Sequence, residues 1–135
     1  DNIRLGINKN LSFSNQDRQE NIRRIAEVTK LFVEAGVVTF CCFVSPTHKM
    51  RKLAKNVIGE NDFFEVFVST NLETCEIRDV KGLYKKARKG EIKDFTGVSS
   101  SFENPVNPDL VLDTENKSIN EIGETLISVL INKLK

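Results

Sequence analysis

The sequence predicts an α/β domain in which helices cover both faces of a mainly parallel β-sheet. Two observations favour this class. Strand-like and helix-like patterns alternate along the chain. One strand-like run, residues 37–45 ("VVTFCCFVS"), consists almost throughout of apolar and β-branched residues, which is typical of a strand covered on both faces. A length of 135 residues is enough for one domain with its own core.

The first helix is predicted over residues 15–35. Ser14 stands where an N-cap belongs, and Asp17 follows three residues later in place of the usual Glu or Gln of a capping box. Gly36 is a natural helix terminator. Residues expected to face inward recur at helical spacing, namely Ile22, Ile25, Ala26, Thr29, Phe32 and Val33.

The remaining elements follow in alternation. After the strand over 37–45 we expect a helix over 47–59, a strand over 63–69, a short helix over 71–79 and a strand over 109–113. Ser118 and Glu121 stand at capping-box spacing and open a last helix. Its inward residues are expected to be Ile119, Ile122, Leu126, Val129 and Leu130.

Ligands of open parallel sheets bind beyond the carboxyl ends of the strands. In this sequence those ends are marked by Ser45, by Ser69 and Thr70, and by Asp113 and Thr114. We therefore expect the chemistry at this edge of the sheet.

Composition excludes several classes of protein. A net charge of +1 argues against a dedicated nucleic-acid binder, and no apolar run is long enough to cross a bilayer. No basic segment followed by an apolar one, as in a signal peptide, opens the sequence. The three cysteines, Cys41, Cys42 and Cys75, show no metal-ligand spacing, so no metal site is assigned to them. Cys41 and Cys42 lie in the apolar run, which predicts reduced core thiols in a cytoplasmic protein.

Positive charge is concentrated in one stretch, Arg78–Phe95, which holds seven Lys or Arg and three Asp or Glu. Three interpretations are open: a solvated helix face, a nucleic-acid patch, or a segment that binds a small anion. Nucleic-acid binding is the weakest of these, because the charge is local and few aromatic residues are interleaved with it.

Four stretches of the sequence are distinctive, namely "DNIRLGINKNLSFSNQDRQENIRRIAEV", "FVSP", "EVFVSTNLETCEIRDVKGLYKKARKGEIKDFTG" and "NPDLVLDT". Together they resemble the adenylylsulfate kinase family, across the whole chain and at nearly constant spacing. The resemblance implies a three-layer P-loop-kinase-like domain over residues 1–135, with a lid over about residues 79–100. It implies a cytoplasmic transferase of sulfate assimilation that moves the γ-phosphoryl of ATP, with Mg²⁺, to the 3′-hydroxyl of adenylyl sulfate. Homodimer formation and fusion or association with an ATP sulfurylase remain open.

Members of this family begin with a strand, a Gly-rich phosphate-binding loop, a helix and a strand ending in Asp-Gly-Asp, of which this sequence contains only the last Asp, Asp1. Since that loop positions the phosphoryl donor, residues 1–135 alone are expected to be inactive. Three explanations stay open. The sequence omits an N-terminal part, it is a deliberate fragment, or the protein naturally lacks the P-loop. In the last case it would be a regulatory nucleotide-sensing module fused to an ATP sulfurylase.

The resemblance also implies site residues. The adenylyl sulfate site would comprise Asp1, Asn2, Arg4, Phe13, Arg18, Asn21, Val44, Ser45, Lys81 and Phe95. The ATP site would include Arg78 and Lys117. Asp1 would orient the acceptor hydroxyl and take its proton. The resemblance also implies that Ser45, recorded as a phosphoserine in some members, is a catalytic residue that contacts adenylyl sulfate. No covalent step on Ser45 is expected, because in-line transfer needs positioning and charge neutralisation and not a protein nucleophile.

The residues themselves allow other roles for some of these positions. Phe13 precedes the helix cap, where a hydrophobic staple is the structural alternative to stacking on adenine. Arg18 lies in the first helical turn, where the helix dipole disfavours a cation, so it needs either an anionic ligand or a salt bridge within the helix. His48 is expected to be an exposed helix residue. Asp94 stands where the family often has Gly, and Ser99 where it often has Asp.

Overall fold

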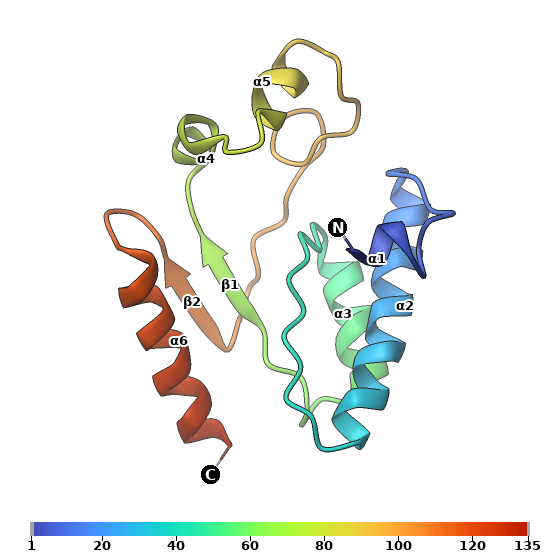
Figure 1. Cartoon of the computed structure of the whole chain (residues 1–135), viewed down its shortest axis with the longest axis vertical. Helices are drawn as coiled ribbons and strands as arrows, with labels where there is room; N and C mark the ends of the chain where they lie inside the picture. Colours follow the sequence, from blue (N-terminus) through green and yellow to red (C-terminus); the bar gives the residue numbers. More distant parts are fainter. Residues whose placement is uncertain (1, 135) are drawn as a thin grey trace. The chain divides into compact units, whose positions relative to one another are not determined.

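A computed structural model describes residues 2–134, which form two compact units (Figure 1). One unit is Asp1–Phe63 together with Lys93–Asn104, and the other is Phe64–Ile92 together with Pro105–Lys135. The boundary between Ile92 and Lys93 falls inside the lid predicted over about residues 79–100. The single domain over 1–135 and its lid stay predictions.

The first unit is built on two helices that pack against each other, α2 (Asn15–Glu34) and α3 (His48–Ile58). Both follow the predicted ranges. Their contact buries one face of α2 together with one side chain of α3, through Ile22, Ile25, Ala26, Thr29 and Met50. Burial of each large aliphatic side chain contributes about 1.5–3 kcal/mol, so this contact is the core of the unit. Phe32, predicted to face inward, is 50% exposed near the end of α2.

The cap of α2 comes from the side chain predicted for it, with one difference. The Ser14 hydroxyl accepts from the Asp17 backbone N–H at 3.1 Å. The Asp17 carboxylate, however, accepts from the backbone N–H and hydroxyl of Ser12, so the reciprocal half of the predicted capping box is wrong. Asp17 has a shorter side chain than Glu, and it binds the preceding loop instead. Thr47 caps α3, which ends at Gly59 with φ +111.

A short helix, α1 (Asn2–Leu5), precedes α2 and was not predicted from the sequence. Asp1 lies outside the described residues.

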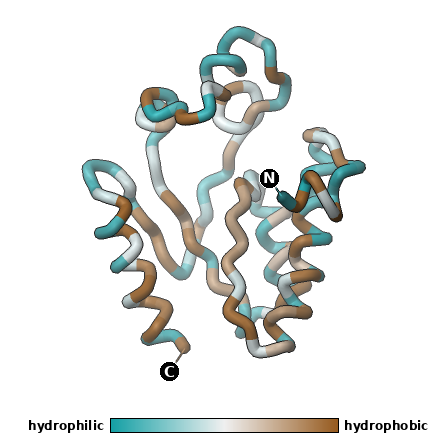
Figure 2. Tube along the Cα trace, in the orientation of Figure 1, coloured by the Kyte–Doolittle hydropathy of each residue, from teal (hydrophilic) through white to brown (hydrophobic). Residues whose placement is uncertain are grey.

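The predicted strand over residues 37–45 is wrong. This segment is extended but belongs to no ladder, because a strand needs a hydrogen-bonded neighbour and, among residues 2–134, only β1 and β2 pair along a ladder of named strands. Val38, Phe40 and Val44 are 54%, 65% and 60% exposed, and the trace is apolar in Figure 2. Cys41 and Cys42 are also exposed, so the core thiols predicted for this run are wrong.

The second unit contains the parallel pair β1 (Val66–Ser69) and β2 (Leu110–Asp113), in register from Val66 opposite Leu110 to Ser69 opposite Asp113. Both strands are shorter than predicted. The helices α4 (Leu72–Arg78) and α5 (Leu83–Arg88) follow β1, and α6 (Ile119–Lys133) packs on β2. Parallel strands flanked by helices confirm the predicted α/β class.

The last helix begins as predicted. The Ser118 hydroxyl accepts from the Glu121 N–H, and the Glu121 carboxylate accepts from the Ser118 N–H at 2.8 Å, which completes a capping box. Four of the five residues expected to face inward are half-buried, namely Ile122, Leu126, Val129 and Leu130. Ile119, the first residue of the helix, is 88% exposed, so its predicted burial is wrong. Between residues 2 and 134, no helix has the length and apolar character that crossing a membrane requires.

Candidate functional site

An exposed aromatic ring lies close to two guanidinium groups in the first unit. Phe13 is 58% exposed, with the guanidinium carbon of Arg4 at 4.2 Å and that of Arg18 at 5.7 Å from its ring centroid. Arg4 is held there because it donates to the carbonyls of Leu11 and Ser12, at 3.2 and 3.0 Å. The structure thus brings together three predicted site residues, and we call this group the aromatic–arginine cluster (Arg4, Phe13 and Arg18).

Arg18 connects this cluster to a segment far along the chain. Its guanidinium donates to the carbonyl of Phe13 at 2.8 Å, the hydroxyl of Thr96 at 3.0 Å and the carbonyl of Asp94 at 2.5 Å. All three acceptors are neutral, unlike either partner expected from the sequence. Partial burial, followed by the positive charge of Arg4, lowers the pKa of Arg18, and Asp94 opposes this shift. A cation in this position would therefore be stabilised by a further anion.

Phe95, the second predicted aromatic, follows the residue that Arg18 binds. Its backbone N–H donates to the Ser99 hydroxyl at 2.9 Å, so Ser99 serves here as a hydrogen-bond acceptor, a role that the Asp common in the resembled family could also fill. Asp94 has φ +53, a backbone conformation that Gly adopts at no steric cost and Asp tolerates. This explains in physical terms why Gly is common at the position.

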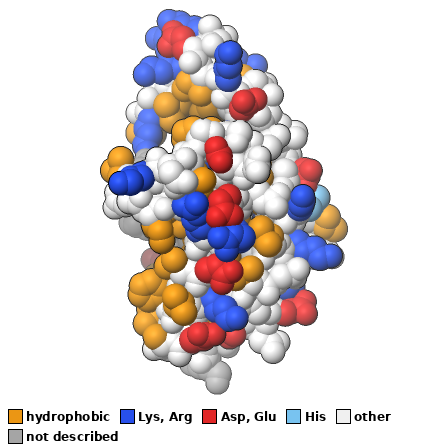
Figure 3. Space-filling model, turned by 90° about the vertical axis from the view of Figure 1, so that its right-hand side faces the viewer, with side chains coloured by type: hydrophobic (Ala, Val, Ile, Leu, Met, Phe, Trp, Pro, Cys, Tyr) orange, Lys and Arg blue, Asp and Glu red, His pale blue; other side chains and the backbone are white. Residues whose placement is uncertain are grey.

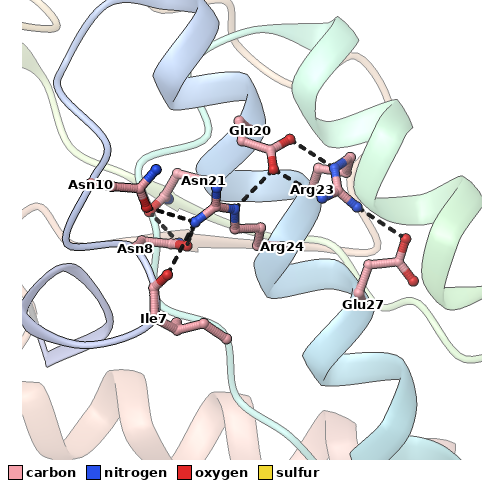
Figure 4. A network of polar contacts seen from close by, with 8 residues as sticks. All are labelled: Ile7, Asn8, Asn10, Glu20, Asn21, Arg23, Arg24 and Glu27. Carbon is pink, nitrogen blue, oxygen red and sulfur yellow. Dashed lines mark hydrogen bonds and ion pairs between the residues drawn. The ribbon is translucent and has the colours of Figure 1, made fainter.

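Asn21 is buried in a polar network at the start of α2 (Figure 4). Its side-chain oxygen accepts from the amide of Asn8 at 3.0 Å, and Asn8 is fully buried. Arg24 donates to the side-chain oxygens of Asn8 and Asn10 at 3.3 and 2.9 Å, and it pairs with Glu20 at 2.9 Å. The predicted contact of Asn21 with a nucleotide stays a prediction. Sequence analysis missed Asn8, because an Asn in a polar loop gives no sign of burial.

The adjoining surface of α2 is charged, and Glu20 belongs to both, because it pairs with Arg23 as well as with Arg24. Figure 3 shows basic and acidic side chains interleaved on this side of the molecule. Arg23 pairs with Glu20 at 2.7 Å and with Glu27 at 3.4 Å, and all three residues belong to α2. These surface pairs satisfy one another, so this surface is a solvated helix face and not a candidate site.

Ser45 and Val44 lie at the end of the extended segment. Ser45 has φ +41, and its carbonyl accepts from Arg51 at 2.8 Å. Val44 is exposed. His48, the first residue of α3, is exposed as predicted. Asn2, the first residue of α1, is also exposed.

In the second unit, the predicted sheet edge is confirmed for β1 and β2, whose carboxyl ends meet. The hydroxyls of Thr70 and Thr114 are 2.5 Å apart. Arg78 donates to the hydroxyl and the carbonyl of Thr114, at 3.1 and 2.9 Å. Glu115 accepts from the Asn71 backbone N–H at 3.0 Å. The guanidinium plane of Arg78 is thereby fixed at the edge where ligands of parallel sheets bind.

The basic stretch contains a short helix, α5, which carries Lys85, Lys86 and Arg88. Arg88 pairs with Glu76 of α4, whereas Lys81, in the loop before α5, and Lys117, after β2, are exposed. Burial of the Asp79 carboxyl opposes ionisation, but N–H donation by Lys85 and Tyr84 lowers its pKa. Asp79 thus holds the start of α5 as an anion.

Comparisons with known proteins identify the family of this chain. The family model described as adenylylsulphate kinase matches residues 1–113. The adenylyl-sulfate kinase of Bacteroides thetaiotaomicron is 57% identical over 135 residues, which are 100% of this chain and 67% of the relative. That of Phocaeicola vulgatus is 56% identical over 131 residues, or 97% of this chain and 64% of the relative. The chain therefore spans about two thirds of the length of these curated relatives.

Among solved structures, the Mycobacterium tuberculosis APS kinase in complex with AMPPNP and APS superposes with a TM-score of 0.91 at 45% identity. The match covers 96% of this chain and 75% of that one.

Proposed function

Because the chain belongs to the adenylylsulfate kinase family, we propose that the full-length protein phosphorylates adenylyl sulfate with ATP. In the proposed reaction, the 3′-oxygen of adenylyl sulfate forms a bond to the γ-phosphorus of ATP. The bond from that phosphorus to the bridging oxygen of ADP breaks, and the hydroxyl proton passes to a base. The products are 3′-phosphoadenylyl sulfate and ADP.

The observation that carries the proposal is the aromatic–arginine cluster. Adenylyl sulfate combines a flat base with an anionic phosphosulfate group. An exposed Phe13 ring offers a stacking surface of about 1–3 kcal/mol per base. The two guanidiniums beside the ring supply positive charge, and an anion would offset the partial burial that lowers the pKa of Arg18. We propose that Phe95 supplies a second aromatic contact to the same base, and that Asn2, Asn21, Val44 and Ser45 complete the site.

For the donor nucleotide, we propose that Arg78 stacks on the adenine of ATP. Its hydrogen bonds to Thr114 hold the guanidinium plane in one orientation, which stacking on a base requires. We assign Lys117 to the same nucleotide. The exposed Lys81 would contact the phosphosulfate of the acceptor, and the lysines of α5 would raise the local positive potential. Closure of this segment over the nucleotides would exclude water from the transfer.

We propose Asp1 as the base that takes the hydroxyl proton, and Mg²⁺ as the ion that accompanies ATP. Within residues 2–134, no group of three or more His, Cys, Asp or Glu side chains is placed to hold a metal ion. These residues therefore do not fit a protein-held metal centre, and no step is assigned to one. We also propose a cytoplasmic location, which is supported by the free thiols of Cys41, Cys42 and Cys75. Dimerisation and association with an ATP sulfurylase remain predictions.

The test is ATP-dependent formation of 3′-phosphoadenylyl sulfate by the full-length protein, followed by chromatography of the nucleotides. Isothermal titration calorimetry would measure binding of each nucleotide in parallel, with a non-hydrolysable ATP analogue as the control for turnover. We expect product and ADP to appear in equal amounts. Binding of both nucleotides without product would contradict the kinase proposal and favour a regulatory role.

A further inference from the structure

The backbone of Ser45 adopts a conformation that its sequence disfavours. Its φ of +41 lies in the left-handed region, where a residue other than Gly, Asn or Asp is uncommon. The following residue, Pro46, further restricts Ser45, because the proline ring crowds the backbone before it and favours an extended conformation there. Such a conformation persists only where surrounding contacts impose it.

Arg51 of α3 supplies the contact to Ser45 itself. One terminal nitrogen of its guanidinium donates to the Ser45 carbonyl at 2.8 Å. The other donates to the carbonyl of Glu103 at 2.7 Å and lies 2.9 Å from Nδ1 of His48. The guanidinium carbon also lies 5.8 Å from the centroid of the Phe102 ring. Arg51 is therefore held from several sides while it binds Ser45.

Glu103 holds the residues that follow Ser45. Its backbone N–H donates to the carbonyl of Pro46 at 2.8 Å, and its carboxylate accepts from the backbone N–H of His48 at 2.5 Å. Residues 45–48 are thus fixed between α3 and the segment around Glu103, all within one compact unit. The turn that carries Ser45 is held by hydrogen bonds from Arg51 and His48 to Glu103, which lies 52 and 55 positions further along the sequence.

We propose that Arg51 is a positioning residue for the acceptor site, which holds Ser45 in its left-handed conformation and so fixes how Ser45 meets adenylyl sulfate. This inference rests on the proposed function, in which Ser45 contacts the substrate. Arginine suits the task because its planar fork binds two carbonyls at once, which the single ammonium of Lys cannot do in the same geometry. Arg51 itself need not touch the substrate.

The first test is a double-mutant cycle on the thermal stability of the full-length protein. Arg51→Gln is introduced into the wild type and into the Ser45→Gly background. Gly adopts positive φ without strain, so Arg51 has less to hold in place in the Ser45→Gly background. The fall in Tm caused by Arg51→Gln should therefore be at most about half as large there as in the wild type. Equal Tm shifts in the two backgrounds would overturn the proposal. If Arg51→Gln does not fold, Arg51→Lys takes its place in the same cycle.

The second test separates the two substrates. Arg51→Gln should raise the KM for adenylyl sulfate about tenfold and leave the KM for ATP within about twofold of the wild type, because only the acceptor contact is displaced. Lys52→Gln, an exposed position on the same helix, is the matched control and should change neither KM. An unchanged KM for adenylyl sulfate, or equal rises in both constants, would overturn the proposal.

Failure of the proposed function is distinguishable from failure of this inference. A wild-type protein without turnover contradicts the kinase proposal alone. The dissociation constant of adenylyl sulfate, measured by calorimetry for the wild type and Arg51→Gln, then replaces KM. A tenfold weakening supports the positioning role of Arg51, and an unchanged constant overturns it.

Discussion

Replacement of Arg18 tests whether this arginine connects the two predicted aromatic positions or only supplies charge. Arg18→Gln removes three hydrogen bonds, to Phe13, Asp94 and Thr96. A hydrogen bond to a charged group contributes about 1.5–3 kcal/mol when buried. Two of the three are exposed to solvent, which reduces their contribution, so we expect a loss of about 2 kcal/mol in the free energy of unfolding.

In a full-length protein of about 150–250 residues, a loss of about 2 kcal/mol corresponds to a fall in Tm of roughly 4–8 °C. Differential scanning calorimetry measures it. Because the same contacts position Phe13 and the segment that carries Phe95, the KM for adenylyl sulfate should also rise by about tenfold or more. Arg23→Gln is the control on the same helix. Arg23 lies in exposed ion pairs, so its loss should leave the KM for adenylyl sulfate unchanged.

Arg18→Lys gives the decisive comparison. Lysine keeps the positive charge, but its ammonium cannot reach three acceptors that are arranged for a guanidinium fork. If Arg18 connects the two segments, the Lys variant should retain most of the defect in both Tm and KM. Thr96→Val, which removes one acceptor without altering charge, should lower the stability by about 0.5–1.5 kcal/mol. Full recovery of both Tm and KM by Arg18→Lys would refute the connecting role and leave a purely electrostatic one.

Three further predictions concern other parts of the molecule. Hydrogen bonds from Arg23 and then Arg24 lower the pKa of Glu20 from 4.5 to about 2. The stabilising effect of the Glu20 carboxylate is therefore present above pH 4.5 and is lost as the pH falls toward 2. In Glu20→Gln, the Tm should fall less steeply between pH 5 and about 2 than in the wild type. Ser118→Ala removes the N-cap of α6 and should cost about 1 kcal/mol in urea unfolding, whereas Ser118→Asp, which keeps an N-cap acceptor, should cost much less; equal losses would contradict the capping role. Lys81→Ala should weaken adenylyl sulfate binding by about 1–3 kcal/mol in calorimetry, and Lys86→Ala, on the exposed surface of α5, by much less; an unchanged dissociation constant for Lys81→Ala would remove Lys81 from the site.

The helices could be predicted from the sequence because their signals are local. Ser14, Thr47 and Ser118 each precede an apolar period of 3.6 residues, and each accepts a hydrogen bond from the helix it begins. The parallel pair of β1 and β2 could be predicted for a related reason, since two apolar runs separated by helices favour a parallel arrangement. These signals depend on residues within one turn or one strand of each other.

The segment over residues 37–45 shows where local reasoning fails. Its apolar and β-branched residues favour an extended chain, and the backbone is extended as this preference predicts. Pairing and burial, however, depend on a neighbouring strand and on covering layers, which are properties of distant parts of a chain. The positive φ of Ser45 was equally beyond prediction, because Ser before Pro favours the opposite conformation and the contact that overrides this comes from Arg51.

The contacts that hold the predicted site residues in place could not be predicted from the sequence. Arg18 and Arg78 were assigned to ligands, yet each also binds a backbone carbonyl, of Asp94 and of Thr114 respectively. Nothing in a sequence marks a distant carbonyl as a partner, because every residue carries one. The carbonyl groups that accept hydrogen bonds from Arg18 and Arg78 could therefore be identified only in the structure.

These carbonyl contacts do not compete with binding of an anion. A guanidinium has five N–H donors, and Arg18 uses three hydrogen bonds for the contacts described. Carbonyl and hydroxyl oxygens are neutral, so they orient the group without cancelling its charge, whereas an ion pair such as that of Arg88 with Glu76 offsets it. A positive group fixed by neutral acceptors keeps its charge and is already oriented, so binding of the proposed phosphosulfate would cost little further ordering of this side chain. For this reason an arginine held by distant carbonyls is a stronger candidate ligand for the nucleotide than an arginine paired with a nearby carboxylate.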